Sequence, residues 1–283
     1  MVEIPDEVVL LEGALAADRY GGTAAGGQVV AYTCPSPYKD TVNEDTVAII
    51  PYGPDAVALL VADGAGGLPA GKRASLAAAS TLVKSLHAAI AEEMLLRTAI
   101  LDGIEAANRA VLELGNGSAT TLTVVTVEGV NARAYQIGDS EAMVVGQRGL
   151  LKLQTPVHSP TGFAVEAGLL DQRDALHHEE RHLVSNFIGT VDMRIDVGME
   201  LGLRPRDSIL LASDGLMDNV HIEEIISCIR VGPIADAVER LVTLAGERMA
   251  GGSARQPSKP DDLSLILYRK PYRPVPAKSS ADR

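Results

Sequence analysis

The feature that most constrains this chain is a buried strand that ends at an acidic residue. The apolar run Ala56–Ala62 predicts a strand, and Asp63 follows it directly. Three glycines lie within the next four positions, and the stretch from Lys72 to Ile90 has helical periodicity. Glycine lets the backbone approach a ligand closely, and a carboxylate beside backbone carbonyls suits Mg²⁺ or Mn²⁺. The alternative is a strand-to-helix turn in which Asp63 bonds only local amides.

Four more acidic segments lie at the edges of predicted strands. They are Asn43-Glu44-Asp45, Gly138-Asp139-Ser140, Ser213-Asp214-Gly215 and Asp261-Asp262. Carboxylates that a fold brings together repel one another, which raises their pKa values. Bound divalent cations remove this repulsion and keep the carboxylates ionised. The sequence therefore predicts a metal site at which several strand ends meet.

These segments resemble, in order, the motifs of the metal-dependent protein phosphatases, the PPM or PP2C-like serine/threonine phosphatases of bacterial type. The matching residues are 43–45, 63–67 with 71 and 74–75, 118–122, 137–140, 211–218 and 261–264. Alternating β runs and helix pairs already favour two antiparallel sheets with helices packed outside. The resemblance implies the same α+β fold, a four-layer αββα sandwich. We expect one phosphatase domain over residues 1–270 and a disordered tail over 271–283.

The resemblance also implies a site for two Mn²⁺ or Mg²⁺ ions, with a possible third, that activate a water for in-line attack on phosphorus. Asp63, Asp214 and Asp261 would be the catalytic carboxylates. The expected metal ligands are Asp63 as the bridge, the carbonyl of Gly64, Asp214 and Asp261 at the second ion, Asp45 or Glu44 completing that ion's shell, and Asp139 at the third. The residues leave open whether Glu44 or Asp45 contacts the metal directly.

Three positions depart from the family's pattern. Ala65 stands where many eukaryotic members carry a histidine that could protonate the leaving alcohol. Glu141 follows Gly138-Asp139-Ser140, where the family usually has arginine. Met217 replaces a frequent tryptophan, an apolar exchange that packing can absorb.

The arginine that usually grips phosphate before the first acidic motif is also missing. Lys39 is the nearest cation, and a lysine offers a point charge in place of a bidentate fork. Arg73 and Arg173 are the alternatives that the sequence leaves open for this role.

The remaining elements are predicted from periodicity. Helical stripes predict a second helix over residues 91–114, and short strands with glycine turns predict an antiparallel meander over 121–153. Residues 154–194 are polar, correspond to the family's flap, and carry His158, His177, His178 and His182. Histidines without carboxylates at ligand spacing seldom bind metal, so we expect a solvated loop there.

Composition restricts location and partners. The 283 residues have a formal net charge of −12, which disfavours binding to nucleic acid or anionic membranes. Cys34 and Cys228 are too few for a disulfide framework and fit a reducing cytosol. Neither a leader nor an apolar run near 18 residues is visible in the sequence, so we expect a cytoplasmic monomer.

Three functions compete. The first is a serine/threonine phosphatase that acts on a phosphoprotein opposed by a kinase. The second is a pseudophosphatase that binds a phosphoprotein or regulator without turnover, which the missing arginine favours. The third is a scaffold whose acidic turns are incidental, which the ordered set of motifs disfavours.

Overall fold

The computed structural model describes residues 7–13, 15–37, 42–65, 70–115, 117–181, 183–251 and 256–271. The expected phosphate contact Lys39 and nearly all of the expected tail 271–283 lie outside these residues.

Two antiparallel sheets form the centre of the molecule. The first has the strand order β1 (Val9–Glu12), β4 (Thr46–Pro51), β5 (Ala56–Ala62), β8 (Leu122–Glu128), β9 (Asn131–Ile137) and β12 (Asp196–Val197), with β13 (Leu201–Gly202) also on β9. The second has the order β11 (Leu151–Gln154), β10 (Glu141–Val145), β14 (Ser208–Ala212), β15 (Leu263–Arg269), β3 (Gly27–Cys34) and β2 (Asp18–Ala24).

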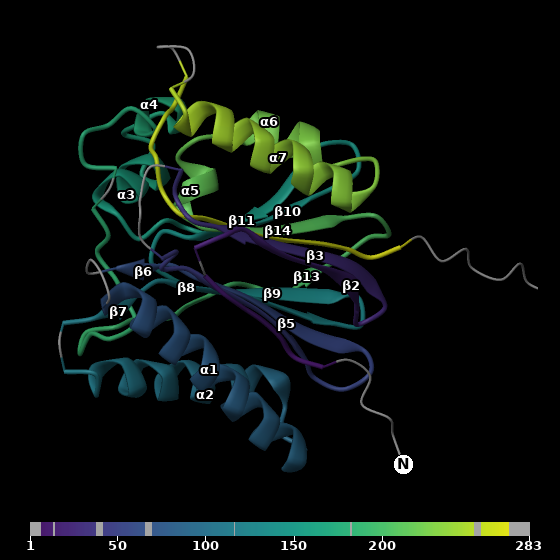
Figure 1. The fold of residues 1–283 in the computed structure, drawn as a ribbon. Helices are drawn as coiled ribbons and strands as arrows, with labels where there is room; N and C mark the ends of the chain where they lie inside the picture. The colour runs from purple at the N-terminus through teal and green to yellow at the C-terminus, as the bar shows by residue number, and fades with distance from the viewer. Residues whose placement is uncertain are drawn as a thin grey trace, which may run out of the picture.

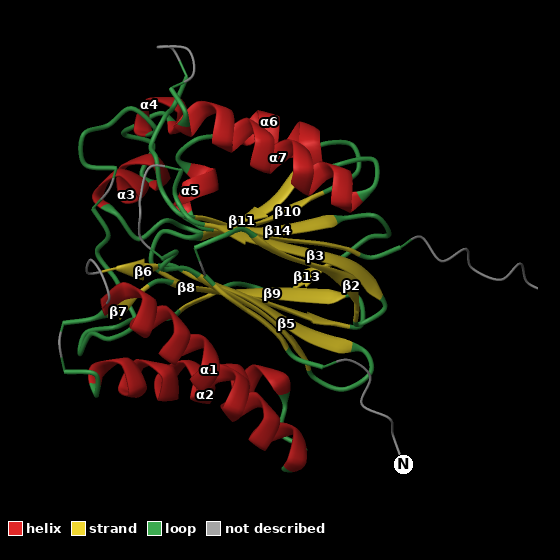
Figure 2. Ribbon diagram, in the orientation of Figure 1, coloured by secondary structure: helices red, strands yellow, loops and turns green. Residues whose placement is uncertain are grey.

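Helices cover both outer faces, which gives the predicted four-layer αββα sandwich (Figures 1 and 2). The first sheet carries α1 (Ala70–Ala91) and α2 (Leu96–Leu112). The second sheet carries α5 (Asp214–Met217), α6 (Ile222–Ile229) and α7 (Ile234–Met249). At one end of the sandwich lie α3 (Pro160–Glu166), α4 (Gln172–Ala175) and the short pair β6 (Gly64–Ala65) and β7 (Ala119–Thr120).

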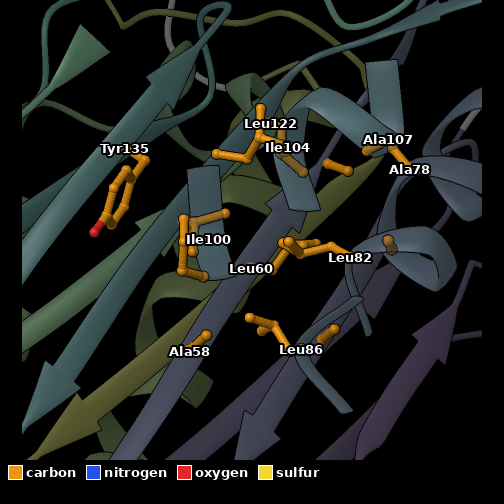
Figure 3. Packing of buried hydrophobic residues seen from close by; sticks show 14 of the residues in the cluster. Ala58, Leu60, Ala78, Leu82, Leu86, Ile100, Ile104, Ala107, Leu122 and Tyr135 are labelled. Carbon is orange, nitrogen blue, oxygen red and sulfur yellow. The ribbon is translucent and has the colours of Figure 1, made fainter. Parts of the chain in front are cut away.

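Strand β5 shows why its sequence is apolar throughout. Its alternate residues Ala58, Leu60 and Ala62 pack toward the helices, whereas Val57, Leu59 and Val61 pack between the two sheets. Because both faces of the strand are buried, the usual alternation of apolar and polar residues disappears. Figure 3 shows Leu60 beside Leu82 of α1 and Ile100 of α2. The strand that delivers Asp63 is therefore held in the middle of the sandwich.

Two sequence predictions differ from the structure. The second helix begins at Leu96 and not at Ala91, because Glu93 adopts a left-handed φ of 53° and the Met94 N–H closes α1 on the carbonyl of Ala89 at 3.0 Å. The predicted meander over 121–153 is split between the sheets, since β8 and β9 belong to the first and β10 and β11 to the second. The chain crosses from one sheet to the other at residues 138–140.

By length and composition alone, helix α1 is long and apolar enough to cross a membrane, although no apolar run of that length was expected. Its residues Ala78, Leu82 and Leu86 are fully buried against the first sheet and α2. Core helices of globular domains share this composition.

Candidate active site

Five aspartates converge at the end of the sandwich. Asp63 follows β5, Asp139 lies just after β9, Asp214 opens α5 after β14, and Asp45 and Asp261 precede β4 and β15. Burial raises the pKa of Asp63 well above its usual range, and the charges of Asp45, Asp214, Asp139 and Asp261 raise it further. The four other carboxylates are therefore all within electrostatic reach of Asp63, as the sequence predicted.

Asp45 is fully buried and carries an oxygen that fits a cation. Burial, followed by the charge of Asp262, raises its pKa to about 8. Ser213 Oγ donates to Asp45 Oδ2 at 3.0 Å. Within the described part of the chain, Asp45 Oδ1 and Asp214 Oδ1 are buried without a hydrogen-bond donor. A buried carboxylate oxygen without a donor is costly, and a divalent cation would relieve that cost at both residues.

Glycines shape the neighbouring part of the site. A Cβ on Gly71 would stand 2.6 Å from both the carbonyl oxygen of Gly64 and Oε1 of Glu44. Only glycine at position 71 therefore leaves these two oxygens where they are. The Gly64 carbonyl and the Glu44 carboxylate are both oxygen donors of the kind that Mg²⁺ and Mn²⁺ accept. The structure thus places Glu44 as well as Asp45 beside the predicted site.

Hydroxyl groups fix the backbone of Asp63. Its N–H donates to Thr121 Oγ1 at 2.9 Å, and its carbonyl accepts from the N–H of Thr121 and from Thr120 Oγ1, both at 2.8 Å. Thr121 Oγ1 in turn bonds Ser140 Oγ at 2.8 Å. These bonds explain why the segments 118–122 and 138–140 accompany an acidic strand end: they fix the backbone from which the Asp63 side chain extends.

Asp262 is a residue whose role sequence reasoning missed. Its side chain is buried, and its two oxygens accept from the N–H groups of Ser36 and Glu44, both at 2.8 Å. The side chain thereby ties β15 to the loop before β4. Because successive residues near a strand point in opposite directions, Asp261 remains directed to the site while Asp262 points into the fold. The doubled aspartate was the only sequence signal for this division.

Lys259 is the second residue that was missed. Its ammonium contacts Asp214, lies 3.0 Å from Asp218 Oδ2 and lies 3.5 Å from Asp261 Oδ2. Burial alone would lower its pKa, but the charges of Asp214, Asp218 and Asp261 outweigh burial and raise it. Among the described residues, no three carboxylate, imidazole or thiolate side chains stand ready around a common metal position. The lysine ammonium lies between carboxylates of the predicted second ion.

A cavity of about 710 Å³ opens beside these carboxylates, between the α3–α4 segment and α5–α6. Asp139, Asp214 and Asp218 line it together with Glu141. Glu141 is 9% exposed and accepts from Gln154 Nε2 at 2.7 Å. Burial, partly offset by that bond and reinforced by the charge of Asp218, raises its pKa to about 7.

The cations proposed for phosphate differ in position. Arg173 lines the cavity but is largely exposed and pairs with Glu223 at 3.1 Å. Arg73 is exposed near the start of α1. Arg181 also lines the cavity and lies 4.0 Å from Asp218. Arg173 and Arg181 are the described arginines that line the cavity, and Arg181 is the one that lies beside the acidic cluster.

The histidines of the flap divide into two kinds. His177 and His178 are exposed, as expected for a solvated loop, and His182 lies outside the described residues. His158 does not fit that expectation, because it is 4% exposed. Its Nδ1 accepts from the Gly138 N–H at 3.1 Å, so the other ring nitrogen carries the proton and donates to Asp196 at 2.9 Å. His158 therefore fastens the flap to the turn that carries Asp139.

The family model described as Protein phosphatase 2C matches residues 37–248. The chain belongs to the protein phosphatase 2C family. The phosphatase is similar to PhpP of Streptococcus pneumoniae, with 30% identity over 222 residues that cover 76% of this chain and 89% of the relative. It is 27% identical to the serine/threonine protein phosphatase PstP of Mycobacterium tuberculosis over 232 residues, 80% of this chain and 41% of PstP.

Solved structures agree with the fold. A serine/threonine phosphatase of S. agalactiae superposes with a TM-score of 0.71 at 25% identity, covering 89% of this chain and 99% of that one. The phosphatase MsPP of Mycobacterium smegmatis, solved in complex with cacodylate, gives a TM-score of 0.68 at 26% identity, with 91% and 99% covered. The predicted family, sandwich fold and serine/threonine phosphatase function are thereby confirmed, and the pseudophosphatase alternative is not favoured.

Proposed function

We propose that this phosphatase hydrolyses phosphoserine and phosphothreonine in proteins and depends on two Mn²⁺ or Mg²⁺ ions, with room for a third. The observation that carries this proposal is the convergence of five aspartates, two of which keep a buried oxygen without a donor. A catalytic domain of PstP has been solved in complex with two manganese ions, at 23% identity and a TM-score of 0.65. That finding belongs to PstP and supports the proposal here through the shared fold.

The residues that would hold the ions come from both sheets. Asp63 follows β5 of the first sheet and Gly64 opens β6, Asp214 and Asp261 flank β14 and β15 of the second sheet, and Asp45 or Glu44 comes from the loop before β4. Asp139 lies toward the cavity, where a third ion would be held. When bound, such ions lower the pKa of a coordinated water and neutralise charge on the phosphoryl oxygens.

The chain's own groups would orient the reaction. Thr120 and Thr121 fix the backbone of Asp63, so that the main chain at this end of β5 needs no reorganisation when substrate arrives. The cavity beside Asp139 and Asp214 would receive the residues that flank the phosphorylated side chain. Arg181, at the rim of the acidic cluster, is our candidate for the missing phosphate-binding arginine. Ala65 offers no proton to the leaving alcohol, so a water would supply it.

We infer further that the enzyme opposes a serine/threonine kinase, acts as a monomer and resides in the cytoplasm. The relatives named as protein phosphatases, PhpP and PstP, support a phosphoprotein substrate. The free thiols of Cys34 and Cys228 suit a reducing compartment.

The test is metal-dependent hydrolysis of p-nitrophenyl phosphate and of phosphoserine and phosphothreonine peptides. We expect turnover with Mn²⁺ or Mg²⁺, none in EDTA, and loss of at least about 1000-fold in Asp63→Asn and Asp214→Asn, since each removes a ligand charge. The matched control is Asp55→Asn in the exposed turn before β5, which should keep full activity. Undiminished activity in EDTA or in Asp63→Asn would contradict the mechanism.

A further inference from the structure

Lys259 occupies a place that a second metal ion needs. Its ammonium contacts Asp214 and lies 3.5 Å from Asp261 Oδ2, and these two carboxylates are the proposed ligands of the second ion. Its third neighbour, Asp218, is 3.0 Å away. The lysine side chain is only 20% exposed, so most of its charge is balanced by these carboxylates and not by water.

The backbone around Lys259 is anchored, so the lysine is held at this place. The side chain of the fully buried Asn219 accepts from the Lys259 N–H at 2.7 Å and donates to the Lys259 carbonyl at 2.8 Å. The preceding Ser258 donates its hydroxyl to the Arg248 carbonyl at 2.8 Å. Its own carbonyl accepts from Arg181 at 3.2 Å. Helix α7 and two connecting segments, at Asn219 and at Arg181, therefore hold the segment that carries the ammonium.

An ammonium and a divalent cation cannot occupy the same position between Asp214 and Asp261. We propose that Lys259 is a tethered competitor of divalent cations, which occupies the acidic cluster when metal is scarce and must leave Asp214 and Asp261 before the second ion binds. This inference rests on the proposed metal dependence. Competition from Lys259 means that the enzyme needs a higher metal concentration than the same carboxylates would need without the lysine. In the metal-free site, the ammonium offsets the mutual repulsion of the carboxylates.

The first test measures Mn²⁺ binding by titration calorimetry on metal-free protein at pH 7. Lys259→Gln and Lys259→Met should bind the weaker ion at least about tenfold more tightly, because a competing charge at contact distance has been removed. Lys259→Arg keeps the charge and should stay within about threefold of the wild type. The control Lys152→Gln removes a lysine paired with the buried Asp207, outside the cluster, and should change the affinity less than twofold.

Thermal unfolding gives a second readout that does not depend on activity. In EDTA, the Lys259→Gln variant should melt below the wild type, and Mn²⁺ should raise its melting temperature by more than it raises that of the wild type. An equal Mn²⁺ affinity in the wild type and in both neutral variants would overturn the inference. If Mn²⁺ binds to none of these proteins, the proposed metal dependence itself fails, and the inference falls with it.

A labelling experiment on the unmodified chain tests the same point without any variant. Acetylation of Lys259 by an amine reagent, followed by mass spectrometry, should be slow in EDTA and several-fold faster with saturating Mn²⁺, because the displaced ammonium enters solvent. Lys152 serves as the internal reference, and its labelling should not respond to Mn²⁺. Labelling of Lys259 that is unchanged by Mn²⁺, in protein shown by calorimetry to bind it, would contradict displacement.

Discussion

The substitution Gly71→Ala should disturb the geometry of the site strongly while it changes the stability of the fold only slightly. The added Cβ would stand 2.6 Å from the Gly64 carbonyl oxygen and from Glu44 Oε1, and ordinary contact begins near 3.4 Å. Each oxygen must therefore retreat by roughly 0.8 Å. Displacements of about 1 Å at a reacting centre cost about 100-fold in rate, so we expect kcat on p-nitrophenyl phosphate to fall by about that factor and Mn²⁺ to bind more weakly.

Stability should change much less, because two effects oppose each other. Overpacking costs about 1–3 kcal/mol, whereas replacing a helical glycine by alanine returns up to about 1 kcal/mol. The control is Gly246→Ala in α7, where a Cβ meets no atom within 4 Å, and it should add about 0.5–1 kcal/mol with unchanged kcat. Urea unfolding measures the free energy of unfolding, calorimetry measures the Mn²⁺ affinity, and steady-state kinetics measure kcat. If Gly71→Ala keeps kcat and Mn²⁺ affinity within threefold of the wild type, the two oxygens beside Gly71 do not need their present positions for metal binding or catalysis.

Three further predictions concern the support of the site. Arg248→Met should lower the free energy of unfolding by about 2–4 kcal/mol in urea titrations, because Arg248 is 2% exposed and donates to both oxygens of Glu224 at 2.6 and 2.8 Å; a change below 1 kcal/mol would contradict this. Gly215→Ala should give insoluble or unfolded protein, since its Cβ would overlap the rigid backbone carbonyl of Asp262; a normal melting curve refutes it. In EDTA, stability should fall as pH rises from about 4 to about 8, and Asp45 alone should contribute up to about 1.4 kcal/mol per pH unit. The reason is that the pKa of Asp45, which burial chiefly raises to about 8, keeps this residue protonated in the folded state while it ionises in the unfolded state. Asp45→Asn should reduce the slope by that one-proton contribution, leaving the part that comes from Asp63 and the other buried carboxylates, and an unchanged slope would exclude a contribution from Asp45.

Much of the fold was predictable because its signals are local. A strand buried on both faces, such as β5, is apolar throughout, and the acidic residues that interrupt such runs mark strand ends. Together with the order of the motifs, these signals were enough for the sandwich and for the convergence of Asp63 with Asp214 and Asp261. The split between β9 and β10 was not predictable, because a glycine turn such as 138–140 can close a hairpin or cross between sheets, and only the packing partners decide.

The residues that were missed act through contacts between distant segments. Lys259 lies in a Gly/Ser/Pro-rich loop, and its partners Asp214 and Asp218 come some 40 residues earlier, so its sequence neighbourhood gives no sign of an ion pair. His158 appeared as one of several flap histidines, but its bond from the Gly138 N–H distinguishes it from exposed His177. A periodicity reports which face of an element is buried, whereas it does not report which polar side chain that element will meet.

Strand β15 lies inside the second sheet, between β14 and β3, although it follows every other described strand in the chain. During synthesis, β2 and β3 therefore leave the ribosome long before the strand that joins them to β14. Until residue 269 has emerged, the β2–β3 pair cannot join β14 through β15. Asp261 and Asp262, which precede β15, are then not in place either. A newly made copy can therefore assemble the full set of five aspartates only after β15 has emerged and paired with both β14 and β3.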